Sequence, residues 1–120
     1  MHKNFTIYLV FILFLTFSFS ACSQQFMDNQ IRFGIQAAQK ELWDEAIFRW
    51  KKAVEADPNS AAAHNNLAVA YEKKGLWEEA KKEYETALRI SPENKYIKSN
   101  YDDFKKHYES LTIEKKNEKN

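Results

Sequence analysis

The sequence contains one cysteine, two glycines and two prolines among its 120 residues. Since Cys22 has no partner within the chain, an internal disulfide is excluded. The two glycines, Gly34 and Gly75, are too few for a glycine-rich phosphate-binding loop. An excess of one charge is also missing: of 18 Lys and Arg residues only Lys3 precedes residue 22, which leaves 17 against 17 Asp and Glu. The sequence therefore lacks the basic excess that is typical of nucleic-acid-binding proteins.

Histidine is equally scarce, and occurs at His2, His64 and His107. His107 follows Asp103 by one helical turn, but a metal site needs three or four ligands and no third one is apparent. We interpret this pair as solvated side chains, and we expect His64 to pack between helices. The sequence predicts no catalytic residue, no metal ligand and no cofactor, so we do not expect an enzyme.

The first 21 residues differ from the rest of the chain. Residues 5–19 are almost wholly apolar and uncharged, and they follow a short start that contains Lys3. A basic start before an apolar run of this length is typical of a secretory signal, whereas a membrane-spanning helix needs about 20 apolar residues. The small residues Ser20 and Ala21 come next, and Cys22 follows them directly.

This arrangement resembles the lipobox of bacterial lipoproteins, in which small residues precede a cysteine at the end of a signal peptide. Phe19 stands where that family usually has leucine. The resemblance implies cleavage before Cys22, acylation of its thiol with diacylglycerol and acylation of the new amino terminus, which together would anchor the chain stably. Three alternatives remain: an ordinary signal peptide cut after Ala21, an uncleaved membrane anchor, and an apolar segment of a cytosolic core.

The body of the chain repeats itself at an interval of 34 residues. Residues of like kind recur at this interval, in the pairs Phe33 and Leu67, Trp43 and Trp77, Ala46 and Ala80, Trp50 and Tyr84, Ala53 and Ala87, and Pro58 and Pro92. A repeat of this length cannot bury its apolar face alone, so such repeats stack into a helical solenoid.

Each repeat has the pattern of two antiparallel helices. In the first helix of the second repeat, Leu67, Ala70, Tyr71 and Lys74 follow i, i+3, i+4 and i+7 spacing, and the first three give one face an apolar stripe. Gly75 then supplies the left-handed conformation that commonly ends a helix, and Glu41 takes that position in the first repeat. Pro58 and Pro92 end the second helix of each repeat, because proline lacks an amide donor.

Residues 61–94 resemble the tetratricopeptide repeat, whose pattern is W-x-x-L-G-x-x-Y, then A-x-x-x-F, then P. The positions that carry the resemblance are His64, Leu67, Ala68, Tyr71, Gly75, Ala80, Tyr84, Ala87 and Pro92. Residues 27–60 are a weaker copy, with Gln30, Phe33, Gly34, Ala37, Trp43, Ala46, Trp50, Ala53 and Pro58. The resemblance implies an all-α fold in which two helix–turn–helix repeats form an α-solenoid.

One more amphipathic helix is predicted after the second repeat. Its apolar stripe consists of Ile97, Tyr101, Phe104 and Tyr108, and its other face is charged, as a terminal cap requires. The predicted organisation is a signal peptide at 1–21, a lipidated tether at 22–26, repeats at 27–60 and 61–94, a capping helix at 95–110 and a tail at 111–120. We expect the tail to be disordered because Ile113 is nearly its only bulky apolar residue and residues 114–120 are all charged or Asn.

In tetratricopeptide proteins the first helix of each pair lines a concave groove that binds a partner. Carried onto this sequence, the groove residues are Ile31, Ile35, Asn65, Asn66, Val69, Lys73 and Tyr96. One variant of the family clamps a terminal carboxylate with two Asn and three basic residues, but only Asn66 fits that pattern here. The resemblance therefore implies an apolar groove that takes an extended peptide or a helix.

Together these features predict a lipid-anchored scaffold or assembly factor in a bacterial cell envelope, tethered through Cys22. The expected partner is another envelope protein, bound in the groove. The resemblance to lipoproteins places the protein on the outer face of the cytoplasmic membrane or the periplasmic side of the outer membrane, and Ser23 favours the latter. The alternative is a homo-oligomer, a self-associating structural protein with no dedicated peptide ligand, since two repeats and a cap make a small array.

Overall fold

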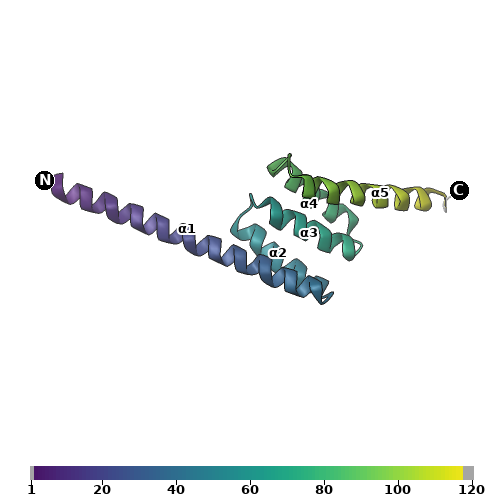
Figure 1. Ribbon diagram of the computed structural model, residues 1–120, viewed down its shortest axis with the longest axis horizontal. Helices are drawn as coiled ribbons and strands as arrows, with labels where there is room; N and C mark the ends of the chain where they lie inside the picture. Colours follow the sequence, from purple (N-terminus) through teal and green to yellow (C-terminus); the bar gives the residue numbers. More distant parts are fainter. Residues whose placement is uncertain (1, 118–120) are drawn as a thin grey trace.

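Within residues 2–117, which the computed structural model describes, the chain forms five helices. These are α1 (His2–Gln39), α2 (Trp43–Ala56), α3 (Ala61–Lys73), α4 (Trp77–Ile90) and α5 (Lys95–Asn117). Side chains are described throughout this range except at 2–6, 11, 13–20 and 115–117. The predicted all-α fold is confirmed, as a stack of antiparallel helix pairs (Figure 1).

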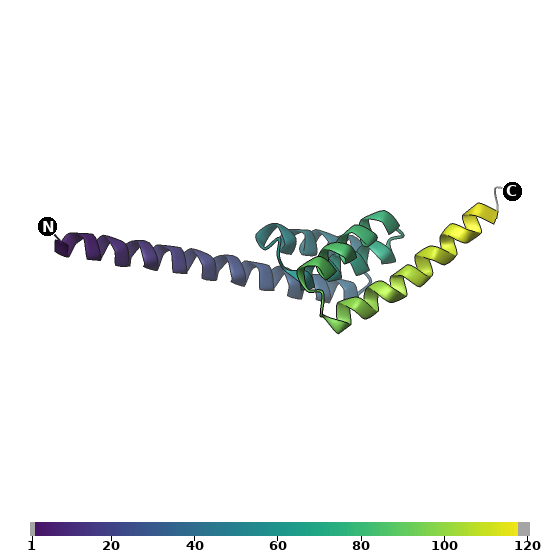
Figure 2. The same cartoon turned by 90° about the horizontal axis from the view of Figure 1, so that it is seen from above.

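The amino-terminal half of α1 projects far beyond the other helices (Figure 2). The molecule is therefore elongated, with extents of 82 × 29 × 24 Å. The second half of α1 pairs with α2, α3 pairs with α4, and α5 packs on α4 and α3 (Figure 1). Short turns at residues 40–42 and 74–76 join the two helices of each pair.

The two turns share one backbone conformation. Gly75 has φ +71° and Glu41 has φ +58°, both in the left-handed region. In each turn the next residue donates its amide hydrogen to a carbonyl one turn back: Leu42 N to Ala37 O at 3.0 Å, and Leu76 N to Tyr71 O at 2.9 Å. This closure satisfies a carbonyl at the end of the helix.

We expect Glu41→Gly to raise the free energy of unfolding by about 1 kcal/mol, because a residue with a Cβ is strained at positive φ. The reciprocal change, Gly75→Glu, is the matched control and should destabilise the chain to a similar extent. Urea denaturation of both variants in detergent micelles measures these shifts. An unchanged transition midpoint for both variants would contradict the proposed strain.

Side chains cap two of the helices. The Ser60 hydroxyl accepts a hydrogen bond from Ala63 N at 3.2 Å, and Asn94 Oδ1 accepts from Tyr96 N and Ile97 N at 3.0 and 3.1 Å. Such bonds satisfy amide hydrogens that have no partner within the helix. Together with the preceding prolines, Pro58 and Pro92, these caps separate one repeat from the next.

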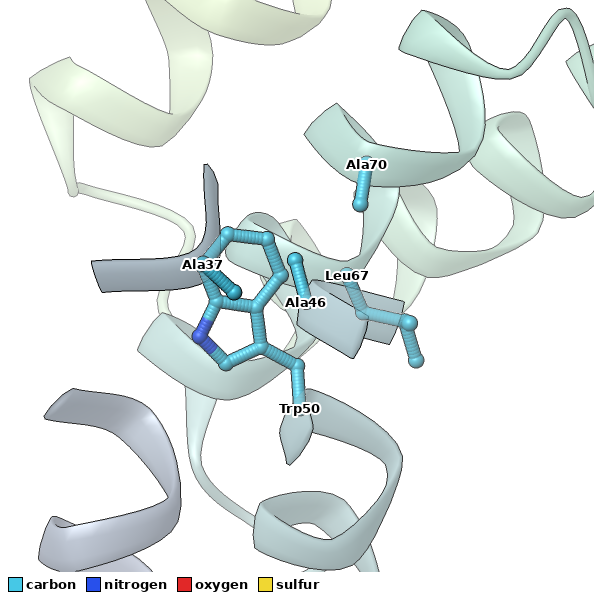
Figure 3. Close-up of a cluster of buried hydrophobic side chains, with 5 residues drawn as sticks. All are labelled: Ala37, Ala46, Trp50, Leu67 and Ala70. Carbon is cyan, nitrogen blue, oxygen red and sulfur yellow. The ribbon is translucent and has the colours of Figure 1, made fainter. Parts of the chain in front are cut away.

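The first core cluster lies between the two repeats (Figure 3). Trp50 on α2 is 3% exposed and packs with Leu67 on α3, which is 2% exposed. Ala37, Ala46 and Ala70 complete the cluster, and their small side chains let the helices approach closely. The Trp50 indole also donates a hydrogen bond to the carbonyl of Ile31 at 3.2 Å, which fixes the orientation of the ring.

A second, aromatic cluster joins α5 to the second repeat. Phe104 is 1% exposed, and its ring centroid lies 5.2 Å from that of Tyr84 and 6.3 Å from that of Trp77. Tyr101 and Tyr108 stack on it from α5 itself, at 6.1 and 5.6 Å. This packing holds α5 in place as the last layer of the stack.

The structure differs from the predicted organisation at both ends. α1 runs without a break from His2 to Gln39, so residues 22–26 are helical, and no helix boundary separates residues 2–21 from the first repeat. α5 does not end at Ser110 but continues to Asn117, so the expectation of a disordered tail is wrong for residues 111–117. Leu111 is half-buried there, and Glu and Lys are good helix formers. Residues 118–120 of the predicted tail, and Met1 of the predicted signal peptide, lie outside the described residues.

Among the residues that the structure describes, no helix has both the length and the apolar character needed to traverse a bilayer. Most side chains of the apolar run at 5–19 lie outside that description.

Candidate partner-binding surface

The predicted groove residues lie on the first helix of each layer, α1, α3 and α5, and three of them are accessible. Ile35 on α1 is 42% exposed, Tyr96 on α5 is 71% exposed, and Lys73 on α3 is also exposed. Two apolar side chains and one cation are therefore available to a partner on successive layers of the stack.

Three further groove residues are half-buried. Ile31 packs against Met27 and Ala63, and Val69 packs against the aromatic cluster around Phe104. Asn66 has intermediate exposure. Ile31 and Val69 thus divide their surface between the core and the groove, which limits what they offer to a partner.

Asn65 does not belong to the accessible surface. It is 3% exposed, and its Oδ1 accepts a hydrogen bond from Asn100 Nδ2 at 3.0 Å. This bond connects α3 to α5 and satisfies a buried amide. The prediction that Asn65 contacts a partner is therefore wrong, because α5 covers it.

Glu72 on α3 contacts residues of two other helices, α4 and α5. Its Oε2 accepts a hydrogen bond from the Tyr84 hydroxyl at 3.0 Å, and its Oε1 lies 3.9 Å from His107 Nδ1. Burial, together with the nearby Glu72 carboxylate, raises the pKa of Tyr84 above its usual value, so this hydroxyl stays protonated and donates. His107 also packs edge-on against Trp77, with ring centroids 5.0 Å apart, and Asp103 pairs with Lys106 instead.

His64 is buried between helices, as its position in the repeat predicts. It is 7% exposed, and its Nδ1 lies 2.5 Å from Glu83 Oε2 while Nε2 lies 3.0 Å from the carbonyl oxygen of Pro58. Only the protonated imidazolium donates hydrogen bonds from both nitrogens. The hydrogen bond to Glu83 is the main cause that raises the pKa of His64 above 6.5, while burial opposes it.

This raised pKa makes the stability depend on pH. A group whose pKa is higher in the folded state stabilises it fully below the unfolded pKa of about 6.5, and loses that contribution as pH rises through the folded pKa. We therefore expect the unfolding free energy to fall as the pH is raised from about 6 to about 8.

The variant His64→Gln carries the residue that the first repeat has at this position, Gln30. Urea denaturation across this pH range should show that it has lost this part of the pH dependence. The control His107→Gln changes an exposed imidazole and should retain it. Identical pH profiles for wild type and His64→Gln would contradict this role of His64.

Two surface depressions repeat with the 34-residue interval. One, of about 640 Å³, is lined by Glu41, Leu42, Trp43, Asp44, Glu45 and Lys74. The other, of about 310 Å³, is lined by Gly75, Leu76, Trp77, Glu78, Glu79, Tyr108, Leu111 and Thr112. Both lie at the turns between paired helices, and neither includes a predicted groove residue.

Clusters that could carry metal chemistry are missing from the described part of the chain. No group of three His, Cys, Asp or Glu side chains is close enough there to hold a metal ion. Every buried side-chain nitrogen and oxygen in that part has a hydrogen-bond partner.

Comparison with known protein families agrees with the helix pairs. A family described as "TPR repeat" matches residues 38–75, and one described as "Tetratricopeptide repeat" matches residues 61–94. The chain contains tetratricopeptide repeats. The second match has the same bounds as the second predicted repeat, and the first spans the junction between the two.

Several curated proteins are similar to this tetratricopeptide-repeat chain over part of their length. Type IV pilus assembly protein PilF of Pseudomonas aeruginosa is 34% identical over 77 residues, which is 64% of this chain and 31% of that protein. Protein O-mannosyl-transferase TMTC4 of Mus musculus is 46% identical over 50 residues, or 42% of this chain and 7% of that protein. The chain thus spans less than a third of the curated relatives that it matches. Among solved structures, an Arabidopsis OM64 TPR domain shares 16% identity with a TM-score of 0.40, over 71% of this chain and 98% of that one.

Two side-chain hydrogen bonds to acceptors on α3 were not predicted from the sequence. Asn100 pairs with Asn65, and Glu72 pairs with Tyr84. Both acceptors lie on the first helix of the second repeat, one on each side of Val69. The bond between Asn65 and Asn100 could have been predicted, because residues about one repeat apart lie on neighbouring layers. These two residues are 35 positions apart.

Proposed function

We propose that this protein is a lipid-anchored scaffold or assembly factor of a bacterial cell envelope, which binds a peptide or helix of another envelope protein in its concave groove. The tetratricopeptide repeats support a role in protein–protein interaction. The same proposal assigns no enzymatic activity to the chain.

The observation that carries the groove proposal is the series of accessible apolar side chains on successive first helices. Ile35 on α1 and Tyr96 on α5 are exposed, and the partly exposed Val69 lies on α3 between them in the stack. Large apolar side chains that face solvent on one surface mark a site for a partner. Lys73 adds a cation at the edge, which favours a segment that carries a carboxylate near its apolar residues.

In-cell crosslinking followed by mass spectrometry tests the groove. Ile35→Asp places a charge on the exposed groove without touching the core clusters, and we expect it to remove specific proteins from the captured set. Lys82→Asp is the matched control, since this exposed residue lies on α4, the second helix of its pair. If both variants capture the same proteins as wild type, the groove assignment is wrong.

The anchor proposal rests on Cys22 and on what surrounds it in the sequence. Cys22 is exposed, is the single cysteine, and directly follows the small residues Ser20 and Ala21 at the end of the apolar run. The similarity to part of a type IV pilus assembly protein supports a role as an assembly factor. We place the protein on the periplasmic side of the outer membrane or on the outer face of the cytoplasmic membrane.

Cell fractionation of Cys22→Ser tests the anchor. We expect wild type in the membrane fraction and the variant in the soluble fraction, with Ser23→Ala as a control that stays with the membrane. Metabolic labelling with a fatty-acid analogue should mark wild type and not Cys22→Ser. Continued membrane association of an unlabelled Cys22→Ser protein would favour an uncleaved anchor over lipidation.

A further inference from the structure

The two ends of the helix stack differ in chemical character. At one end α5 turns Ile97 and Phe104 inward and presents a charged outer face, which includes Lys98, Asp102 and Lys105. A polar outer face on the last layer keeps a solenoid soluble. At the other end α1 and α2 have no described helix beyond them (Figures 1 and 2), and Phe33 and Phe48 are 42% and 50% exposed.

The second repeat shows what normally covers this position. Leu67 lies 34 residues after Phe33, at the same place in its repeat, and is only 2% exposed because it packs against Ala37, Ala46 and Trp50 of the preceding layer. Phe33 is exposed because no described layer precedes α1 and α2. The position is thus one that a helix covers in this same molecule.

Cations surround the two phenylalanines. The Arg49 guanidinium carbon lies 5.6 Å from the ring centroid of Phe33 and 5.5 Å from that of Phe48. Arg32 lies 5.2 Å from Phe33, and Lys52 lies 6.0 Å from Phe48. We define Arg32, Phe33, Phe48, Arg49 and Lys52 as the amino-terminal end face.

This combination is not a general property of the repeat. The same positions of the second repeat hold Asn66, Leu67, Lys82, Glu83 and Thr86, with no aromatic residue and one cation. The exposed aromatic rings and the three cations are therefore specific to the repeat at the uncovered end.

We propose that the amino-terminal end face binds an amphipathic helix of a partner protein, which lays an apolar stripe on Phe33 and Phe48 and directs carboxylates to Arg32, Arg49 and Lys52. The occupant is a helix because helices cover Leu67, the equivalent of Phe33 in the second repeat. It is acidic because three cations outnumber the two carboxylates near them, Glu45 beside Arg49 at 2.6 Å and Glu55 beside Lys52 at 2.8 Å. Both pairs are exposed, and such pairs are weak enough for a partner to replace them.

A second copy of the chain fits this face less well than an acidic helix. Two end faces placed against each other would oppose the same three cations, and like charges in contact disfavour association. The surface is also separate from the groove. Phe33 and Ile35 are two residues apart on α1 and so point in directions about 200° apart around the helix axis.

Fluorescence anisotropy with defined synthetic helices tests the proposal, using the full-length chain in nanodiscs of zwitterionic lipid. The probe is a labelled helix of about 18 residues, ~27 Å long, with leucine at i, i+3, i+4 and i+7 and glutamate on both flanks. A second probe has lysine in place of each glutamate. We expect the glutamate helix to bind at least about ten-fold more tightly than the lysine helix, and Phe33→Ser to weaken its binding at least about ten-fold.

A charge reversal provides the sharper test. Arg32→Glu/Arg49→Glu should invert the preference between the two helices while leaving the fold intact, because both side chains point to solvent or lie at the surface. Ile113→Ser is the matched control, since it removes a 60% exposed apolar residue of α5 that belongs neither to the groove nor to the end face, and it should leave binding of the glutamate helix unchanged. Tyr96→Ser reports on binding in the groove instead. Circular dichroism checks that each variant is folded.

Four results would overturn the proposal. If wild type binds both helices equally, the end face does not select an acidic helix. If Tyr96→Ser loses binding of the glutamate helix while Phe33→Ser keeps it, the end face is not the binding site. Dimers in sedimentation experiments that Phe33→Ser dissolves would assign the face to a second copy. Binding of wild type to anionic phosphatidylglycerol vesicles that Phe33→Ser abolishes, without any preference between the helices, would assign it to the membrane surface.

Discussion

Replacing Trp50 by alanine is expected to lower the free energy of unfolding by about 3–5 kcal/mol. Trp50 is 3% exposed and fills the junction between the two repeats, where it packs with Leu67 and three alanines (Figure 3). The small alanines cannot close the space that the indole leaves, and the hydrogen bond to the Ile31 carbonyl is lost as well. Urea denaturation of the full-length chain in micelles measures the loss. Phe48→Ala is the control, since it removes an aromatic side chain that is 50% exposed on the same helix.

Gly34 provides an independent test of the same packing. A Cβ atom at Gly34 would lie 2.3 Å from Trp50 Nε1, so Gly34→Ala should destabilise the chain by about 1–3 kcal/mol although alanine favours helix. The second repeat has Ala68 and Tyr84 at these two positions. The double variant Gly34→Ala/Trp50→Tyr copies that pair, because tyrosine leaves space that the added methyl group occupies. The double variant should lose less unfolding free energy than the sum of the losses of the two single variants. Strict additivity of the losses would contradict direct contact between residues 34 and 50.

The repeat interval was sufficient to predict the helix pairs, because their positions depend on local spacing. The ends of α3 and α4 lie just before residues whose backbone chemistry is visible in the sequence, Gly75 and Pro92. The burial of Trp50 and Tyr84 followed from the same register, because a large residue between small ones must fill the space where helices cross. Glu41 shows the strength of this argument, since it adopts the conformation of its glycine counterpart at φ +58°.

The ends of the helices could not be predicted in the same way. The boundary after Ala21 came from a processing motif, and no glycine or proline interrupts the helix between Ala21 and Gly34. α1 therefore continues through that boundary. α5 extends past Ser110 because charged residues with high helix propensity follow it, and charge alone does not distinguish a solvated helix from a disordered tail.

The sequence also did not predict how exposed each surface residue is. Asn65 and Ile35 occupy groove positions on successive layers, but α5 covers Asn65 while Ile35 lies at the open end of the stack. Which positions a neighbouring layer covers depends on how many layers there are. The same cause accounts for Phe33, which follows the repeat pattern for a buried residue and is exposed because no described layer precedes it.

Replacing Phe104 by alanine is the second change with a large expected effect, again about 3–5 kcal/mol. Phe104 is 1% exposed and contacts the rings of Trp77 and Tyr84 on the second repeat and of Tyr101 and Tyr108 on α5, so it is the buried centre of the aromatic packing between α5 and that repeat. The Tyr101 hydroxyl donates a hydrogen bond to Glu85 at 3.0 Å, but it is too exposed to hold α5 in place alone. Burial and this hydrogen bond raise the pKa of Tyr101 to about 12. Hydrogen exchange of the backbone amides measures the effect along the chain.

Because each layer of a solenoid contacts its neighbours, this loss should be distributed unevenly. Amides of α5 should lose their protection first, and those of α2, which belongs to the other core cluster, should lose least. Ile113→Ala is the matched control: Ile113 lies on the same helix and is 60% exposed, so the change should stay within about 0.5 kcal/mol. An equal loss of protection in α2 and α5 would mean that the array unfolds as one unit. In that case the covered end at α5 would stabilise the uncovered end at α1 as well, and Trp50→Ala would expose the amides of both ends equally.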